Sequence, residues 1–250
     1  MKNLKFKNNM FIFRRKPILS IILSILILLF SVIFTKWIIY RISFPNKTIY
    51  YEESFTKGIN NWNALDATWK AKDGKENGII QLSQKKYATP YVYKKLKLSQ
   101  TPPQNFVWKI RLKVSSFTGN GVTLGTLIFP TGQITLVMNT NNQLGISSNI
   151  FDKPVYSQGL YTHLSKNQWY DIYILINGSN KNITLYAGDT QLLVNPYVSL
   201  TTPVQEIWLG AIWLQGGGQY GAPLNISYTT VDFGNKGLLP KQSFVKYKRS

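Results

Sequence analysis

An uninterrupted apolar run near the start of the chain, Ile18 to Phe34, constrains the fold more than any other segment. Its 17 residues contain no charge, amide, glycine or proline. As an α-helix the run is about 26 Å long, and with residues 35–40 it reaches about 34 Å, against a hydrocarbon core of about 30 Å. Trp37 and Tyr40 suit the membrane interface, and Lys36 can extend its ammonium toward water. The pattern predicts a transmembrane helix rather than the buried core helix of a soluble domain.

The charges before this run indicate its orientation. Residues 1–16 contain six Lys or Arg residues and no acidic residue, and a basic flank of this kind stays in the cytoplasm. A cleaved signal peptide is the alternative, but it needs small residues in an Ala-x-Ala-like pattern after the apolar core. The chain has Thr35-Lys36-Trp37 there instead. We therefore expect an uncleaved signal anchor in the cell membrane, a single-pass type II arrangement with the C-terminal domain outside the cytoplasm.

Charge and cysteine content limit the chemistry of the exported part. Nine of the 29 basic residues lie at or before Lys47 and all ten acidic residues lie after it, which leaves a net charge of +10 on the remainder. Such a surface attracts anionic membranes and acidic cell-wall polymers, although it can also be merely a solvated surface. We expect no nucleic-acid partner, because the lysines are scattered along strands rather than gathered in one stripe. The lack of cysteine excludes disulfides and thiolate metal sites.

Period-two alternation of apolar and polar residues begins after a short linker at residues 41–48. In Phe106 to Val114 the apolar residues alternate with Lys109, Arg111 and Lys113, which predicts a strand with one buried and one solvated face. Similar runs, separated by Gly, Asn and Pro turns, predict further strands at residues 77–82, 89–93, 122–129, 133–139, 143–148, 170–176, 182–187, 206–212 and 225–233. This spacing predicts an all-β fold, a two-sheet antiparallel β-sandwich of the jelly-roll type, preceded by one N-terminal transmembrane helix.

Aromatic and glycine motifs resemble those of the concanavalin A-like lectin/glucanase superfamily, in particular its laminin-G-like jelly rolls. The resemblance covers residues 48–235 and implies a fold rather than a function. It rests on an opening edge strand and hairpin, a central hairpin and two closing strands: Phe55-Thr56-Lys57-Gly58, Asn61-Trp62, Trp69 with Asp73-Gly74, residues 168–178 and 183–189, residues 207–210 and residues 231–233.

The acidic residues do not match the catalytic pattern of glucanases in that superfamily. Those enzymes carry two glutamates in an E-x-D-x-x-E strand, because retaining cleavage needs two carboxyl groups about 5–5.5 Å apart. The adjacent Glu52 and Glu53 would point to opposite faces of a strand. His163 is the only histidine, and the sequence contains no G-x-S-x-G motif that would supply a serine nucleophile for it. A pair could still be assembled from separate strands, for which the candidates are Asp171, Asp189 and Glu206. The enzyme question stays open, and the sequence favours a non-catalytic domain.

A glycine-rich segment supplies the candidate ligand site. Gly216-Gly217-Gly218 lets the backbone approach a ligand closely, and the neighbours Trp213, Gln215 and Tyr220 supply a stacking ring, an amide and a phenol. Sugars are held by such combinations, because the CH-rich face of a pyranose packs on an aromatic ring while polar groups bind its hydroxyls. In the alternative interpretation, Trp208 and Trp213 pack in the core or at an edge, and the glycine run is only a flexible hairpin.

No cofactor is expected apart from a weakly indicated calcium ion. Related sandwiches bind Ca²⁺ through Asp side chains and backbone carbonyls, which makes Asp152 and Asp189 the candidates, although no D-x-D run supports such a site.

The apolar run also carries a stripe of small residues. Ser20, Ser24 and Ser31 share one helix face, and stripes of this kind can pair transmembrane helices. A homodimer through the transmembrane helix is therefore an open expectation.

Together these features predict a membrane-anchored extracytoplasmic domain that binds carbohydrate, namely a cell-surface or wall polysaccharide or an anionic cell-wall polymer. Two rivals stay open: a glycan hydrolase or lyase with a non-standard carboxylate pair, and an envelope protein–protein adhesion or assembly module. The expected organisation is a basic cytoplasmic segment at residues 1–16, a transmembrane signal anchor at 17–40, a linker at 41–48, a jelly-roll ectodomain at 49–236 and a basic C-terminal tail at 237–250.

Overall fold

The chain divides into two compact units, Met1–Pro45 and Asn46–Ser250. The computed structural model describes residues 12–43, 46–83, 90–117, 121–148, 155–156, 163–178, 181–196, 203–210 and 223–240.

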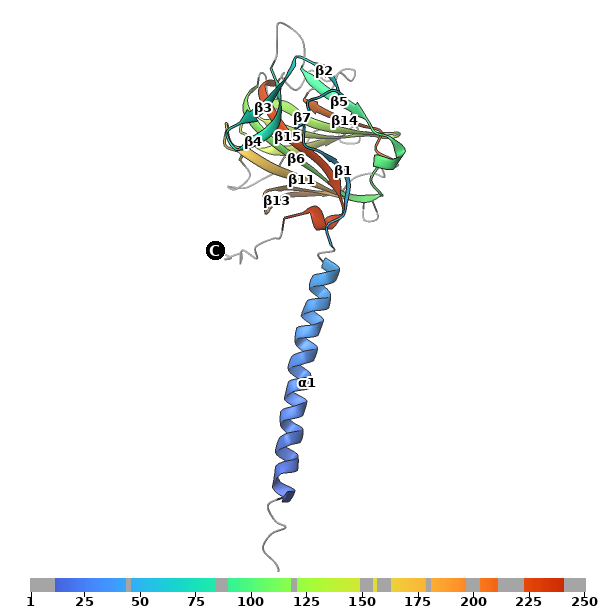
Figure 1. Cartoon of the computed structure of the whole chain (residues 1–250), viewed down its shortest axis with the longest axis vertical. Coiled ribbons are helices and arrows are strands. Elements are labelled where there is room, and N and C mark those ends of the chain that lie inside the picture. The colour runs from blue at the N-terminus through green and yellow to red at the C-terminus, as the bar shows by residue number, and fades with distance from the viewer. Residues whose placement is uncertain are drawn as a thin grey trace, which may run out of the picture. The chain divides into compact units, whose positions relative to one another are not determined.

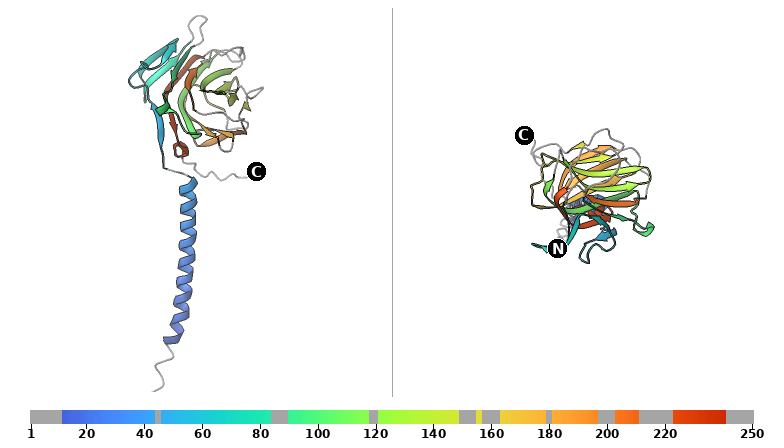
Figure 2. Two further views of the ribbon diagram at one scale, coloured as in Figure 1. Left: turned by 90° about the vertical axis from the view of Figure 1, so that its right-hand side faces the viewer. Right: turned by 90° about the horizontal axis from the view of Figure 1, so that it is seen from above.

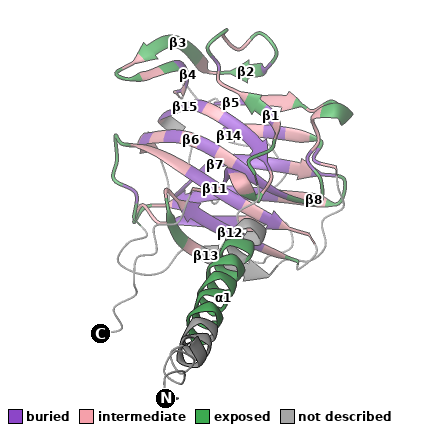
Figure 3. Ribbon diagram, turned by 60° about the horizontal axis from the view of Figure 1, so that its bottom comes forward, coloured by how far each residue is buried: buried purple, intermediate pink, exposed green. Residues whose placement is uncertain are grey.

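The first unit is the helix α1 (Ile12–Ser43). Its stretch Ile21–Ile38 has a mean hydropathy of 2.5 and is long and apolar enough to cross a membrane, and its side chains are exposed along the whole stretch (Figure 3). Two hydroxyls bond within the helix: Ser31 Oγ donates to the carbonyl of Leu28 at 2.8 Å and Thr35 Oγ1 to that of Ser31 at 2.7 Å. These bonds satisfy hydroxyls that hydrocarbon surroundings would leave without water.

The second unit is a sandwich of two antiparallel sheets (Figures 1 and 2), so the predicted all-β fold is confirmed. In sheet A the order is β13-β12-β11-β6-β15-β4-β3, and β1 also pairs with β15. Its strands are β1 (Ile49–Glu53), β3 (Ala67–Asp73), β4 (Glu76–Leu82), β6 (Asn105–Phe117), β11 (Trp169–Asn177), β12 (Asn182–Ala187), β13 (Thr190–Pro196) and β15 (Pro223–Gly234).

Sheet B has the order β10-β9-β8-β7-β14-β5-β2. Its strands are β2 (Asn63–Leu65), β5 (Tyr91–Lys95), β7 (Gly121–Phe129), β8 (Gly132–Asn139), β9 (Leu144–Ser148), β10 (Val155–Tyr156) and β14 (Glu206–Gly210). Two short 3-10 helices complete the described elements, η1 (Leu98–Gln100) and η2 (Lys236–Leu238).

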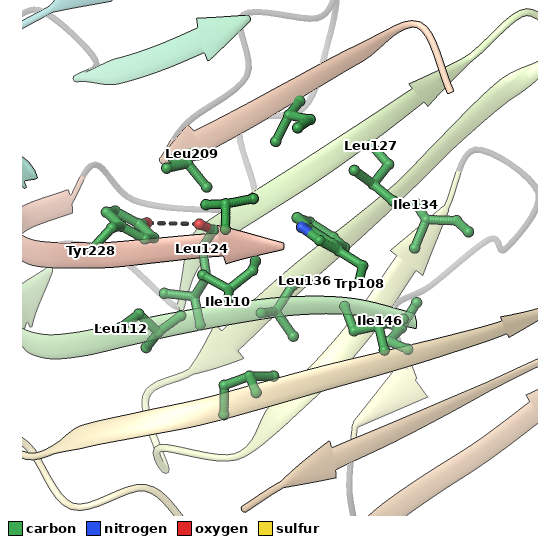
Figure 4. Close-up of a cluster of buried hydrophobic side chains, with 14 of the residues drawn as sticks. Trp108, Ile110, Leu112, Leu124, Leu127, Ile134, Leu136, Ile146, Leu209 and Tyr228 are labelled. Carbon is green, nitrogen blue, oxygen red and sulfur yellow. Dashed lines mark hydrogen bonds between the residues drawn. The ribbon is translucent and has the colours of Figure 1, made fainter. Parts of the chain in front are cut away.

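Alternation along β6 builds the centre of the core. Its inward residues Trp108, Ile110 and Leu112 are fully buried and meet apolar side chains of sheet B, such as Leu127 of β7 (Figure 4). The outward residues Lys109, Arg111 and Lys113 of the same strand are basic, as the alternation predicted. Each such buried apolar side chain stabilises the fold by about 1.5–3 kcal/mol relative to exposure.

A backbone carbonyl at a bulge in β7 accepts a hydrogen bond from a residue of the opposite sheet. The register of β7 with β8 passes from Thr123 directly to Gly125, so Leu124 has no partner in that ladder. The phenol of Tyr228 on β15 crosses the sandwich and donates a hydrogen bond of 2.7 Å to the Leu124 carbonyl (Figure 4). Because buried carbonyls need a donor, this contact fixes the two sheets against each other at one point.

The turn between β1 and β2 contains the opening aromatic motif. The Phe55 ring is fully buried and meets the Trp62 ring edge-on at 5.4 Å, while Trp69 Nε1 donates to the Phe55 carbonyl at 2.7 Å. A Cβ at Gly78, where φ is +65°, would come within 2.5 Å of the backbone of residues 54–56. The turn therefore needs both its aromatic anchors and a glycine beneath it.

Asn235 joins the start of the sandwich to its end. Its Nδ2 donates to the carbonyl of Asn46 at 2.8 Å, and its Oδ1 accepts from the backbone N–H groups of Thr48 and Gly237, each at 3.0 Å. One amide thus caps η2 and holds the first residues of this unit against the last strand.

Candidate ligand-binding surfaces

The outer face of sheet A carries a row of paired charged side chains. The outward residues of β6 lie in register with polar residues of both neighbouring strands: Lys109 is opposite Asp232 of β15, and Arg111 is opposite Asp171 of β11. One end of this face is covered, because Leu238 of η2 packs there in a small apolar cluster.

Arg111 forms the best aligned ion pair of this face. Its Nε and Nη2 donate to the two carboxylate oxygens of Glu76 at 3.0 and 2.5 Å, and its Nη1 lies 3.3 Å from Asp171 Oδ2. The hydrogen bonds from Arg111 lower the pKa of Glu76, and the same bonds raise the pKa of Arg111. Such a bidentate pair holds β4 and β6 in a fixed relation on either side of β15.

Lys109 lies between two carboxylates. Its Nζ is 3.6 Å from Asp171 Oδ1 and 3.9 Å from Asp232 Oδ2. Burial raises the pKa of Asp232 to about 6, because the lowering effect of Lys109 only partly offsets the loss of hydration. Burial, with the two aspartates, also raises the pKa of the neighbouring Tyr173 to about 12. Lys109, Asp171 and Asp232 are thus held by the ion pairs among them, and their side chains are largely shielded from solvent.

Beyond these pairs the outer face of sheet A contains a hollow of about 360 Å³, called here the lysine hollow. This volume falls within the range of roughly 300–1,000 Å³ that is usual for small-ligand sites. The described residues of its lining are polar except for one buried isoleucine. They come from β3, β4, β6, β15 and the segment before β11: Lys70, Lys72, Asp73, Ile79, Gln81, Lys113, Ser115, Asn167, Asn225 and Ser227.

The contacts within the hollow neutralise only one of its lysines. Lys113 Nζ binds the carboxylate of Asp73 and also lies 5.1 Å from the centre of the Trp169 ring. In the described part of the chain, no carboxylate lies within 4.0 Å of Lys70 or Lys72, which are exposed on the edge strand β3. Gln81 Nε2 donates to Asn225 Oδ1 at 2.6 Å, which fixes the two amides in the floor.

The outer face of sheet B carries an aromatic cluster, defined as Tyr91, Tyr93 and Trp208. Tyr93 and Trp208 are cross-strand partners on β5 and β14, and their rings stack at a centroid distance of 4.3 Å and an angle of 10°. Tyr91 lies 5.1 Å from Trp208 and 6.0 Å from Tyr93. All three rings are half-buried, while the alternate residues Val92 and Leu209 of the same strands point into the core.

Polar groups hold the indole of this cluster. Trp208 Nε1 donates to Glu206 Oε2 at 2.9 Å, and the same carboxylate lies 3.9 Å from Lys95 Nζ. In register beside the rings, Asn63 of β2 is opposite Tyr93, and Leu65, which is 41% exposed, is opposite Tyr91. Trp208 therefore belongs to the outer surface. The alternative interpretation of the sequence had it pack in the core or at an edge, and a place in the core is wrong.

The predicted ligand-binding residues Trp213, Gln215 and Tyr220 lie outside the described residues, and so does the calcium candidate Asp152. The other calcium candidate, Asp189, is exposed in the turn between β12 and β13, where Thr190 donates to its carboxylate at 3.5 Å. No group of three His, Asp or Glu side chains suited to a metal ion occurs among the described residues.

The carboxylates considered for catalysis are distributed over both sheets. Asp171 lies in the ion pairs of sheet A, whereas Glu206 lies beside Trp208 on the outer face of sheet B, so these two are not brought together. Asp189 follows Gly188, whose N–H donates to the backbone carbonyl of Asp171 at 2.8 Å. The histidine, His163, is exposed, with its Nδ1 at 2.6 Å from the Asn141 carbonyl oxygen.

Only one cation of the lysine hollow was predicted from the sequence, and the hollow itself was not. Alternation along β6 placed Lys113 on a solvated face, and the Lys70-x-Lys72 spacing would place both side chains on one face of a strand. Which strands become neighbours depends on long-range pairing, and Asn225 meets Gln81 across 144 positions of sequence. Local patterns do not carry that information.

Solved structures of other proteins share this fold. A Trypanosoma rangeli sialidase in complex with sialic acid aligns with a TM-score of 0.51 at 10% identity, over 69% of this chain and 27% of its own. A second sialidase aligns with a TM-score of 0.51 at 11% identity, over 76% of this chain and 19% of its own. The chain spans less than a third of the length of either protein, and at these identities the likeness shows the fold alone. No protein-family model and no curated protein matches the chain.

Proposed function

We propose that this chain is a membrane-anchored extracytoplasmic protein whose sandwich binds carbohydrate, a cell-surface or wall polysaccharide, without cleaving it. We further assign the sandwich to the concanavalin A-like jelly rolls of the laminin-G kind, with α1 as an uncleaved type II signal anchor. The six basic residues at positions 2–16 and the apolar stretch Ile21–Ile38 that follows them support the anchor and its orientation.

The aromatic cluster is the observation that carries this proposal. Three rings gather on an outer sheet face, where core packing does not require them, and the Glu206 carboxylate fixes the central indole. An aromatic ring offers the CH-rich face of a pyranose an apolar surface, and phenol and amide groups nearby can bind its hydroxyls. Tyr91, Tyr93 and Asn63 supply such groups.

The predicted ligand residues follow the cluster closely in the chain. β14 ends at Gly210, two residues after Trp208, and the next described strand begins at Pro223. Trp213, Gln215 and Tyr220 belong to the segment that connects these two strands in the sequence. In this proposal they complete the sugar site, with Trp208 as its fixed part.

The test uses the full chain in uncharged detergent micelles, incubated with soluble and insoluble neutral and acidic polysaccharides. Retention and the release of reducing ends are both scored. We expect retention without release, and loss of retention in Trp208→Ala, Tyr93→Ala, Trp213→Ala and Tyr220→Ala. Leu98→Ala is the matched control, because Leu98 is 82% exposed on η1. Thermal unfolding of each variant checks that it is folded.

Unchanged retention in all four variants would disprove this site. Failure of the intact chain to bind any polymer would remove the carbohydrate function and favour an envelope protein as the partner.

A hydrolase with a non-standard carboxylate pair is the second candidate, and one observation favours it. Asp171 and Asp232 flank Lys109 on neighbouring positions of sheet A, and the pKa of Asp232, raised to about 6, suits a general acid. Release of reducing ends by the intact chain, abolished in Asp232→Asn, would establish this function in place of simple binding.

A further inference from the structure

We infer that the lysine hollow is a second ligand site, separate from the aromatic cluster, which binds the carboxylate or phosphate groups of an acidic polysaccharide. The inference rests on the proposed function in that the ligand is a glycan. It adds the chemical class of that glycan and the residues that select it.

The charge of the hollow favours an anion. Lys70, Lys72 and Lys113 line it together with one acidic residue among those described, Asp73, which is already bound to Lys113. Two ammonium groups are thus left on one side of a 360 Å³ hollow. They come from alternate positions of β3 and therefore project from the same face of that strand. An anionic group placed between them gains from both charges without displacing an existing ion pair.

The uncharged lining favours a sugar as the carrier of that anion. Amides of Gln81, Asn167 and Asn225 and hydroxyls of Ser115 and Ser227 surround the hollow. The Gln81–Asn225 hydrogen bond at 2.6 Å holds the amides in place before a ligand arrives. Groups that both donate and accept match the hydroxyls of a sugar ring, and prior ordering lowers the entropic penalty of binding.

The same lining disfavours a membrane surface as the ligand. Peripheral membrane sites insert exposed apolar side chains beneath the headgroups. Among the described residues of the lining, Ile79 is the only apolar one, and it is 1% exposed. The hollow therefore has charges for a headgroup but no side chain to enter the acyl region.

The position of the hollow allows it to be tested alone. Its residues lie on the outer face of sheet A, whereas the aromatic cluster lies on the outer face of sheet B, with the core between them. Substitutions at Lys70 and Lys72 change two exposed side chains of an edge strand and leave both the core and the cluster untouched.

The experiment measures binding of the full chain, in uncharged micelles, to four probes. These are polygalacturonate, which carries carboxylates, poly(glycerol phosphate), which carries phosphates, a neutral glucan, and glycerophosphoglycerol, the soluble headgroup of phosphatidylglycerol, which cannot take up the apolar helix. The variant Lys70→Gln/Lys72→Gln is compared with Lys57→Gln/Lys181→Gln, which removes the same charge from two exposed lysines outside the hollow.

We expect the hollow variant to bind one acidic polymer roughly tenfold more weakly at low salt, with the difference shrinking as salt rises. Neutral glucan binding and the control variant should be unchanged, and the two acidic polymers decide between carboxylate and phosphate. Equal weakening by both double variants, no preference for acidic polymers, or binding to the lipid headgroup alone would overturn the inference. If the intact chain binds neither the neutral nor the acidic polymers, the proposed function itself is refuted.

Discussion

Tyr228 Oη donates a hydrogen bond of 2.7 Å to the carbonyl oxygen of Leu124, and the two residues belong to different sheets. The phenol is fully buried, and burial raises its pKa far above the ordinary value, so it remains a donor at any physiological pH. The phenol supplies a hydrogen-bond donor to the carbonyl at the β7 bulge from across the core. Removal of this hydrogen bond tests how much it contributes to the stability of the sandwich.

We predict that Tyr228→Phe lowers the free energy of unfolding by about 1–3 kcal/mol, because the buried Leu124 carbonyl then lacks its donor. Denaturant unfolding of the full chain in micelles measures the change. Tyr91→Phe is the control, since that ring lies on the outer face of sheet B, and it should change stability by less than about 0.5 kcal/mol. Equal effects in the two variants would contradict the prediction.

We predict that Gly78→Ala is severely destabilising. The added methyl group would meet backbone atoms of residues 54–56 at 2.5 Å, and φ at this position is +65°. Backbone strain and displacement of the turn should together lower the free energy of unfolding by about 3 kcal/mol or more.

Gly74→Ala provides the matched control for this substitution. Its φ is +63°, but a Cβ there would meet no atom within 4 Å. Gly74→Ala should therefore lower the free energy of unfolding only through backbone strain, by about 1–2 kcal/mol. Similar losses in the two variants would mean that the contact with the turn is unimportant.

The raised pKa of Asp232 predicts a pH-dependent gain from Asp232→Asn. As pH rises from 3.8 to about 6, the unfolded chain loses this proton before the folded chain does, so the aspartate lowers stability progressively and keeps that penalty above pH 6. Lys109 partly compensates the charge, and Glu52 opposes it. At pH 7 the asparagine variant should be more stable by about 2 kcal/mol, a few degrees in Tm.

The gain should be mostly lost near pH 4, where the carboxyl is protonated in the folded chain and about half protonated in the unfolded chain, and it should vanish at still lower pH. Thermal unfolding of both proteins at pH 4 and pH 7 tests this sign. A variant that is less stable than the parent at pH 7 would show that the contact with Lys109 outweighs the loss of hydration.

The anchor predicts that the full chain resists extraction from membranes by alkaline carbonate and is released by detergent. The small-residue stripe further predicts that Ser24→Leu weakens association in a reporter of transmembrane pairing, with Ile25→Leu as the control on another face of the helix. Carbonate release of the chain would contradict the anchor, and an unchanged reporter signal would contradict the dimer alone.

Strong alternation made most of the sandwich predictable. The segment around β6 has basic residues at every second position, and its observed bounds, Asn105–Phe117, contain the predicted strand. Several edge or short strands escaped prediction, among them β2, β10 and β13, because two or three residues form no periodic pattern and TQLLVNP alternates poorly. The W…DG motif did indicate the β3–β4 hairpin, in which Asp73 pairs with Glu76.

The candidate sites were less predictable because they depend on pairing between distant segments. Trp208 could be core or surface from sequence alone, and only the register with Tyr93 shows that two rings stack on the outer face. Likewise Asp232 is an ordinary acidic residue in the sequence, yet pairing of β15 with β6 and β1 buries it beside Lys109 and Glu52.

The position of Lys70 and Lys72 has one more consequence, for the behaviour of many copies anchored side by side. They lie on β3, the last strand in the order of sheet A, whose free edge offers unpaired backbone groups. Antiparallel pairing of two such edges would bring the lysines of both copies together, and repulsion between them opposes this union. The charges assigned to ligand capture thus also oppose the merging of neighbouring sandwiches into a continuous sheet, which guards the protein against aggregation.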